Sequence, residues 1–69
     1  MQELKQELQQ IFKDANVVKW IGGLKVTGLN EVNKHQIASL ITIETKYDEV
    51  EDYVIKRSGT GVVIIIDTF

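Results

Sequence analysis

The chain has 69 residues, of which 43% are hydrophobic and 26% are charged, with no cysteine and no proline. This composition is typical of a globular chain and excludes disulfides and thiolate metal sites. We expect one small domain spanning residues 1–69, with a core that is marginal at this size. Oligomerisation is the remaining way to stabilise so small a scaffold.

The formal net charge of −2 lacks the basic footprint of a nucleic-acid-binding protein, so nucleic acid is not the expected partner. The N-terminus has no basic segment followed by an apolar run, and no apolar stretch approaches the roughly 18 residues of a membrane span. We therefore expect a cytoplasmic protein without a membrane partner. His35 is the only histidine, and we expect no metal and no cofactor.

Residues 2–15 have the spacing of an amphipathic helix. The apolar residues of this segment recur every three or four positions and form one stripe: Leu4, Leu8, Ile11, Phe12 and Ala15. Asn16 then predicts the end of the helix.

Residues 17–21 and 24–27 are predicted to form a hairpin. Gly22-Gly23 supplies the positive φ angles of a tight turn, which places Ile21 opposite Leu24. Alternation then assigns Val17, Ile21, Leu24 and Val26 to the core face. The other face holds Val18, Trp20, Lys25 and Thr27.

The middle of the chain allows two interpretations. The β-branched residues within 37–45 favour a strand. A helix beginning near Asn30 is the alternative, because Leu29, Val32, Gln36 and Leu40 have helical spacing. Further on, Asp48 and Glu51 resemble a capping box, so a helix is predicted before Gly59, which would end it in the left-handed conformation.

The unbroken β-branched run Val62–Ile66 is predicted to form a strand with two apolar faces. The expected order is α-β-β-β-α-β. We predict an α+β fold, a two-layer sandwich with a mixed four-stranded sheet and both helices on one face.

Candidate catalytic groups are isolated in the sequence. Ser58–Gly61 runs from a predicted helix into a strand, the reverse of a phosphate-binding loop. Asp67 follows the last strand without an identifiable partner carboxylate, and His35 lies in a polar stretch. We therefore expect no enzymatic activity.

The candidate interaction residues lie on the second sheet face and in an acidic segment. Val18, Trp20, Ala38, Leu40 and alternate members of 62–66 are predicted to share one apolar surface. Glu49 and Asp52 belong to the acidic run 44–52, which is either a solvated helix face or a docking surface for a basic partner. The predicted partner-binding residues are Val18, Trp20, Lys25, Leu40, Glu49 and Asp52.

The leading hypothesis is a non-catalytic protein–protein interaction module, a small regulator or inhibitor that docks or self-associates through the apolar sheet face. Edge-strand pairing is a second route to a homo-oligomer. Its small size alone raises the idea of a phage or mobile-element origin. One alternative is a small nucleic-acid-binding domain that uses Trp20 with Lys19, Lys25 and Lys34. Another is an enzyme subunit whose site, containing Asp67, is completed across a homomeric interface.

Overall fold

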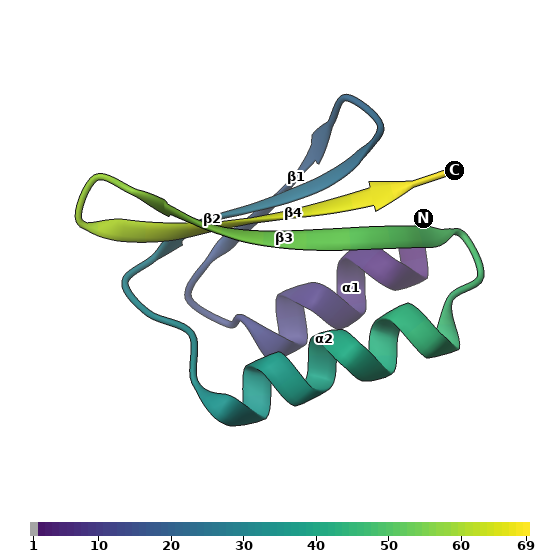
Figure 1. Ribbon diagram of the computed structural model, residues 1–69, viewed down its shortest axis with the longest axis horizontal. Coiled ribbons are helices and arrows are strands. Elements are labelled where there is room, and N and C mark those ends of the chain that lie inside the picture. The colour runs from purple at the N-terminus through teal and green to yellow at the C-terminus, as the bar shows by residue number, and fades with distance from the viewer. Residues whose placement is uncertain (1) are drawn as a thin grey trace.

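The computed structural model describes residues 2–69, which form two helices and four strands (Figure 1). In chain order the elements are α1 (Gln2–Ile11), β1 (Asn16–Trp20), β2 (Gly23–Leu29), α2 (Lys34–Lys46), β3 (Val50–Ser58) and β4 (Gly61–Thr68). The chain therefore consists of two successive units, each a helix followed by a β-hairpin. No helix in residues 2–69 is long and apolar enough to cross a membrane.

The sheet has the order β1-β2-β4-β3, and every neighbouring pair is antiparallel. Both helices lie against one face and leave the other bare (Figure 1). The α+β class is confirmed. The predicted mixed sheet and the order α-β-β-β-α-β are wrong, because the second helix precedes both strands of its unit. No parallel crossover is needed when each hairpin pairs locally.

Helix α1 buries the predicted stripe but ends at Ile11, four residues earlier than expected. The chain then turns, and the Gln9 side-chain amide donates to the carbonyl oxygens of Phe12 (3.2 Å) and Ala15 (2.8 Å). Phe12 and Ala15 remain buried beyond the helix end. These two hydrogen bonds satisfy carbonyls that a longer helix would have used.

The first hairpin forms as predicted but in a register shifted by two residues. Trp20 pairs with Gly23 and Val18 pairs with Lys25, so the turn residues are Ile21 and Gly22. Of the two glycines predicted to form the turn, only Gly22 has a positive φ, of 79°. A two-residue shift preserves the faces, so Val17 and its cross-strand partner Val26 are buried as predicted. The prediction that Ile21 lies on the core face is wrong, because this residue is 91% exposed at the turn.

Residues 37–45 belong to helix α2, so the predicted strand is wrong. The helical alternative is confirmed, except that the helix begins at Lys34 and not near Asn30. The helix starts at Lys34 behind a capping box, in which Asn33 accepts from the Gln36 backbone N–H and Gln36 accepts from that of Asn33. Leu40 and Ile43 point into the core. Hydroxyls of Ser39, Thr42 and Thr45 donate to carbonyls four residues earlier, which accommodates these weak helix formers.

The helix predicted after Asp48 is instead strand β3, whose residues 52–58 pair regularly with β4. A shift in register between Val50 and Asp52 marks a bulge at Glu51. Gly59 does adopt a left-handed conformation, with φ 62°, but it does so in the β3–β4 turn. The predicted left-handed conformation of Gly59 is therefore confirmed. The prediction that Gly59 ends a helix is wrong, because it lies in the turn between two strands.

The core lies between the sheet and the helices. Its largest fully buried side chains come from both helical segments and from the two central strands: Leu4, Leu8, Phe12, Leu40, Ile43, Leu24, Val26, Ile64 and Ile66. No polar or charged side chain among residues 2–69 is buried. The stability of the fold therefore rests on apolar burial and on the sheet hydrogen bonds.

Pairing of β2 with β4 joins the two units, and a glycine stands near each end of this pairing. A Cβ atom at Gly23 would lie 1.8 Å from the carbonyl oxygen of Ile66, and one at Gly61 would lie 2.5 Å from that of Leu29. Only glycine permits such an approach of two backbones. The two units can therefore approach closely near both ends of the β2–β4 pairing, whose register is irregular between Val26 and Leu29.

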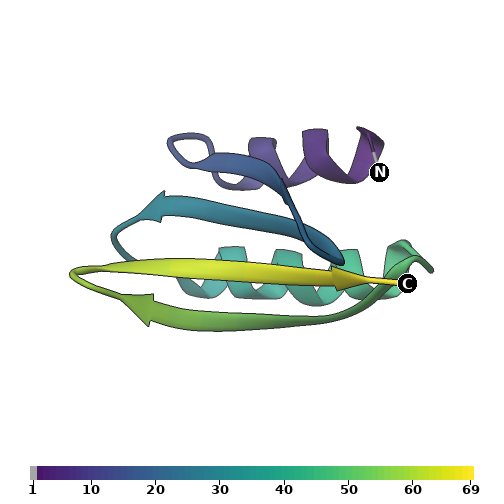
Figure 2. The ribbon, with the colours of Figure 1, turned by 90° about the horizontal axis from the view of Figure 1, so that it is seen from above.

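The outer strands of the sheet have different surroundings. Seen from above, α1 extends beyond β1, whereas β3 runs along the opposite margin with no other element outside it (Figure 2). Strand β1 has five residues and packs against α1. Strand β3 has nine residues, and all except Val50 and Tyr53 are exposed. We call the outer margin of β3 the β3 edge.

Candidate interaction surface

The helix-free side of the sheet, which we call the open face, carries alternate residues of all four strands. By register it comprises Asn16, Val18 and Trp20 of β1, Gly23, Lys25 and Thr27 of β2, Val63, Ile65 and Asp67 of β4, and Asp52, Val54 and Lys56 of β3. Val18 and Val54 are 43% and 38% exposed. An antiparallel sheet with one solvated face usually shows polar residues there, so this apolar content is unusual.

Apolar side chains form the middle of the open face. Val18, Lys25, Ile65 and Val54 follow one another across the four strands in a single row. Val63 lies beside Ile65 on β4 in the neighbouring row. The charged residues Asp52, Lys56 and Asp67 stand around this middle, and Lys25 lies within it. An apolar centre with a polar rim is the general composition of protein interfaces.

Trp20 is the largest side chain on the open face and is 45% exposed. Its cross-strand partner is Gly23, which offers no side chain to cover it. The Lys25 ammonium nitrogen lies 4.0 Å from the centre of the Trp20 ring, within the range of a cation–π interaction. Lys25 therefore orients the indole while leaving nearly half of the Trp20 residue accessible.

The charged residues at one end of the open face repel each other. Asp52 and Asp67 are directly opposed on β3 and β4. Like charges opposite each other destabilise a sheet, and here no ion pair within residues 2–69 relieves them. A basic group placed over this end by a partner would gain from both carboxylates.

The structure brings together only part of the predicted partner-binding set. Val18, Trp20, Lys25 and Asp52 share the open face. The prediction that Leu40 binds a partner is wrong, because this residue of α2 is buried in the core and only 1% exposed. Glu49 is exposed in the turn before β3. Ala38 was expected on the same sheet face and instead lies exposed on α2, in the other layer.

Sequence reasoning missed Val54 and Lys56 as open-face residues because the segment around them was predicted to be helical. The signal that would have placed them is the two-residue turn chemistry at Gly59-Thr60, which predicts a hairpin between two β-branched segments. With 50–58 as a strand, alternation puts Val54 and Lys56 on one face.

The basic residues of the nucleic-acid alternative are not gathered in the fold. Lys25 lies on the open face, whereas Lys19 alternates to the other side of β1 and Lys34 begins α2. The positive charges of Lys25 and Lys56 on the open face are matched by Asp52 and Asp67. No basic groove follows from this arrangement.

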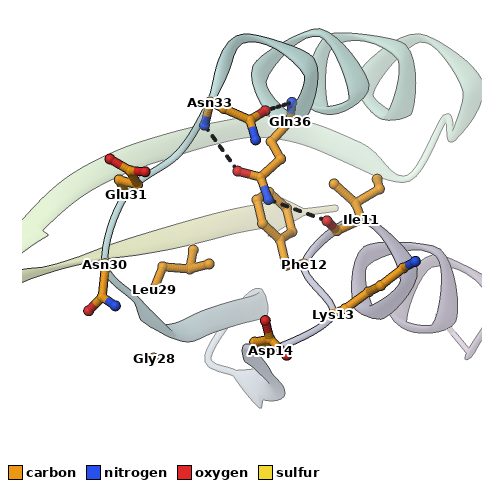
Figure 3. Close-up of a pocket in the computed structure, with 10 residues that line it drawn as sticks. All are labelled: Ile11, Phe12, Lys13, Asp14, Gly28, Leu29, Asn30, Glu31, Asn33 and Gln36. Carbon is orange, nitrogen blue, oxygen red and sulfur yellow. Dashed lines mark hydrogen bonds between the residues drawn. The ribbon is translucent and has the colours of Figure 1, made fainter.

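A hollow of about 430 Å³ lies between the end of α1 and the β2–α2 connection (Figure 3). Gln36 crosses its middle, where its side-chain amide reaches the carbonyl of Ile11 at 3.4 Å. Its carbonyl oxygen belongs to the α2 capping box. Glu31 and Lys13 stand on opposite sides and point away from each other. The central polar group is therefore engaged in holding α1 to α2.

Residues 2–69 contain no group of three or more histidine or acidic side chains placed to hold a metal ion. His35 lies exposed in the first turn of α2. Asp67 lies at the end of β4, with Asp52 and Gly23 as its strand neighbours. No protein-family model, curated protein or solved structure matches this chain.

Proposed function

We propose that this chain is a non-catalytic protein–protein interaction module whose binding surface is the open face. The observation that carries this proposal is the group of apolar side chains on the open face, the exposed Val18 and Val54 with the half-buried Ile65, and the half-exposed Trp20 beside it. Large exposed apolar patches on small proteins are typical of interfaces, and tryptophan is among the residues that most often dominate binding energy. Regulation or inhibition of the bound protein would follow from covering that protein's surface.

The chemistry of the open face defines its partner. The middle requires apolar side chains from the partner, and the end with Asp52 and Asp67 requires a lysine or arginine. An amphipathic segment that carries both kinds of residue meets these needs. We therefore propose a protein partner that places an apolar stripe over Val18 and Ile65 and a basic residue over the two carboxylates.

Site-specific photo-crosslinking in the source cells tests this proposal. A photoreactive residue at position 18 should crosslink one protein, and the same residue at position 13 should not, because Lys13 lies in the turn after α1, in the helical layer. The crosslinked protein is then purified and its affinity for the chain is measured directly. Trp20→Ala should weaken binding by at least tenfold, as expected of an interface anchor.

Ile41→Ser is the matched control, because Ile41 is 52% exposed on α2 in the other layer. It should leave the affinity unchanged. Equal affinity of the wild type, Trp20→Ala and Val18→Ser would contradict the open face as the binding surface. Binding of single-stranded oligonucleotides that weakens steeply with salt would instead support the nucleic-acid alternative.

A further inference from the structure

We propose that the chain forms a homodimer in which β3 pairs antiparallel with β3 of a second copy, with Val54 opposite the partner subunit's Val54. The two four-stranded sheets would join into one continuous sheet of twice the width. This pairing uses the β3 edge, a different surface from the centre of the open face. The two surfaces meet at Asp52, Val54 and Lys56, so a variant away from this border, such as Trp20→Ala, separates the two proposals.

The β3 edge is suited to accept another strand. It is nine residues long, contains no proline and has no helix or loop outside it (Figure 2). An uncovered strand edge carries unpaired backbone N–H and C=O groups, which form hydrogen bonds with any compatible strand. The bulge at Glu51 affects one end, and the pairing of residues 52–58 with β4 is regular.

The charged residues of β3 favour β3 of a second copy as the strand that pairs with the β3 edge. Strand β3 spans Val50–Ser58, so pairing centred on Val54 overlaps its whole length. In this register Asp52 faces the partner subunit's Lys56, and Glu51 faces the partner's Arg57. Two-fold symmetry creates each contact twice. Within residues 2–69 the only ion pair joins Lys46 to Glu7, so these four charged groups have no ionic partner in one copy.

Neighbouring registers lose this complementarity. A shift by one residue would place the helices of the two copies on opposite sides of the joined sheet. A shift by two residues in one direction sets Asp52 against the partner's Val54, and in the other direction sets Lys56 against it. The centred register alone combines full overlap, opposite charges and a common helical layer.

Apolar contacts are available on both sides of the join. On the open face Val54 meets its own copy, which extends the apolar row across both subunits. On the helix side Tyr53 faces the partner's Ile55, an aromatic and β-branched pair that favours strand pairing. Ile55 and Ile37 line a hollow of about 340 Å³ beside β3, and both are more than a third exposed. The partner's Tyr53 would cover this margin.

Cysteine crosslinking tests the register. The chain has no cysteine, so Val54→Cys introduces a single thiol at the symmetry axis. Directly opposed residues of antiparallel strands have Cα atoms about 4.5–5.5 Å apart, within the range of a disulfide. Mild oxidation should convert most of this variant to a covalent dimer at low micromolar concentration. Val18→Cys, a similarly exposed valine on β1, should form no covalent dimer under the same conditions.

Charge exchange tests the contacts independently of thiol chemistry. Asp52→Lys alone, or Lys56→Asp alone, should weaken dimerisation by about tenfold or more, because each places like charges together twice. The double variant should restore the wild-type constant to within about threefold. Lys19→Asp on β1 is the matched control and should have no effect. Sedimentation equilibrium measures all four.

The proposal is overturned if Val54→Cys crosslinks no faster than Val18→Cys, or if the double variant dimerises no better than the single ones. A wild type that stays monomeric at every concentration also overturns it. Trp20→Ala should leave dimerisation unchanged, since β2 and β4 separate β1 from β3. Loss of the dimer with retained open-face binding therefore distinguishes failure of this proposal from failure of the proposed function.

Discussion

The two helix-hairpin units of this chain have the same order of elements but protect their outer strands differently. In the first unit α1 extends beyond the short strand β1 and packs against it. In the second unit α2 lies beneath the sheet, and the longer β3 forms the margin by itself (Figure 2). The first unit thus places its helix below and beyond its outer strand, whereas no element lies outside β3, and most residues of both outer strands are exposed.

The outer strands also differ in length, since β1 has five residues and β3 has nine. Charged side chains on an edge strand normally oppose pairing. On β3 they are arranged as acid and base about Val54, and the proposed self-pairing rests on this arrangement.

The largest expected effect comes from separating the two units. Gly23→Ala should leave the chain mainly unfolded, since the new Cβ atom collides with the backbone of β4 and no rotamer relieves it. Circular dichroism and urea titration measure this. Gly22→Ala is the control, because open space surrounds Gly22 and only its positive φ is strained, which should cost about 1–2 kcal/mol. Equal stability of the two variants would contradict the close pairing of β2 with β4.

The second effect concerns α2, the helix of the second unit. Leu40→Ala should lower the free energy of unfolding by about 2–5 kcal/mol, because it leaves a cavity between α2 and the sheet. Ile41→Ala should cost less than about 1 kcal/mol, because Ile41 is mostly solvated. If the costs were reversed, α2 would have to face the sheet with its other side. Denaturant unfolding of both variants decides this.

The surroundings of Leu40 also illustrate which parts of the fold can be predicted from the sequence and which cannot. The α+β class, the stripe of α1 and the burial of Val17, Leu24 and Val26 followed from periodicity, since period 3.6 and period 2 leave distinct patterns. The prediction of Leu40 on a sheet face is wrong, because the β-branched residues around it favour a strand although Leu40 itself has helical spacing. Tertiary packing overrides that propensity, which is weak in both helices and strands.

The sequence pattern predicts a helix in place of strand β3 for a different reason. Acidic residues followed by basic residues complement a helix dipole, and the same pattern is equally compatible with a strand whose ends pair with a second copy. The sequence of one chain does not distinguish a helix from such a strand, because the distinction depends on which groups the charged side chains face. Trp20 and Val18 were placed on the open face correctly because a hairpin slip of two residues preserves sides.

A smaller effect is expected from the opposed carboxylates on the open face. Asp67→Asn should raise the free energy of unfolding by roughly 0.2–1 kcal/mol, because it removes a like-charge contact with Asp52. Thermal melting at low salt measures the gain, which high salt should reduce. Dimerisation should not change, since Asp67 lies on β4. Glu31→Gln, in the β2–α2 connection, should have no comparable effect.

The smallest expected effect concerns the contact between the helices of the two units. The Lys46 ammonium donates to Glu7 at 2.7 Å, and this hydrogen bond and charge raise the pKa of Lys46 above its ordinary value of 10.5. A raised pKa in the folded state stabilises the fold below 10.5 and loses this contribution as the pH rises through the folded-state value. Glu7→Gln should therefore melt slightly below the wild type at pH 8, with the difference vanishing in strong alkali. Lys5→Met is a control that should show no such convergence.

The division into two units has a consequence for folding kinetics. Every strand pair except β2–β4 joins neighbours in the sequence, so each hairpin can form early and by itself. The β2–β4 pairing, which brings Gly23 to Asp67, is then the last and slowest closure. With no proline and no cysteine in the chain, isomerisation and disulfide exchange add no further delay. Refolding of one subunit should follow a single exponential, and any slower, concentration-dependent phase would report two β3 edges meeting.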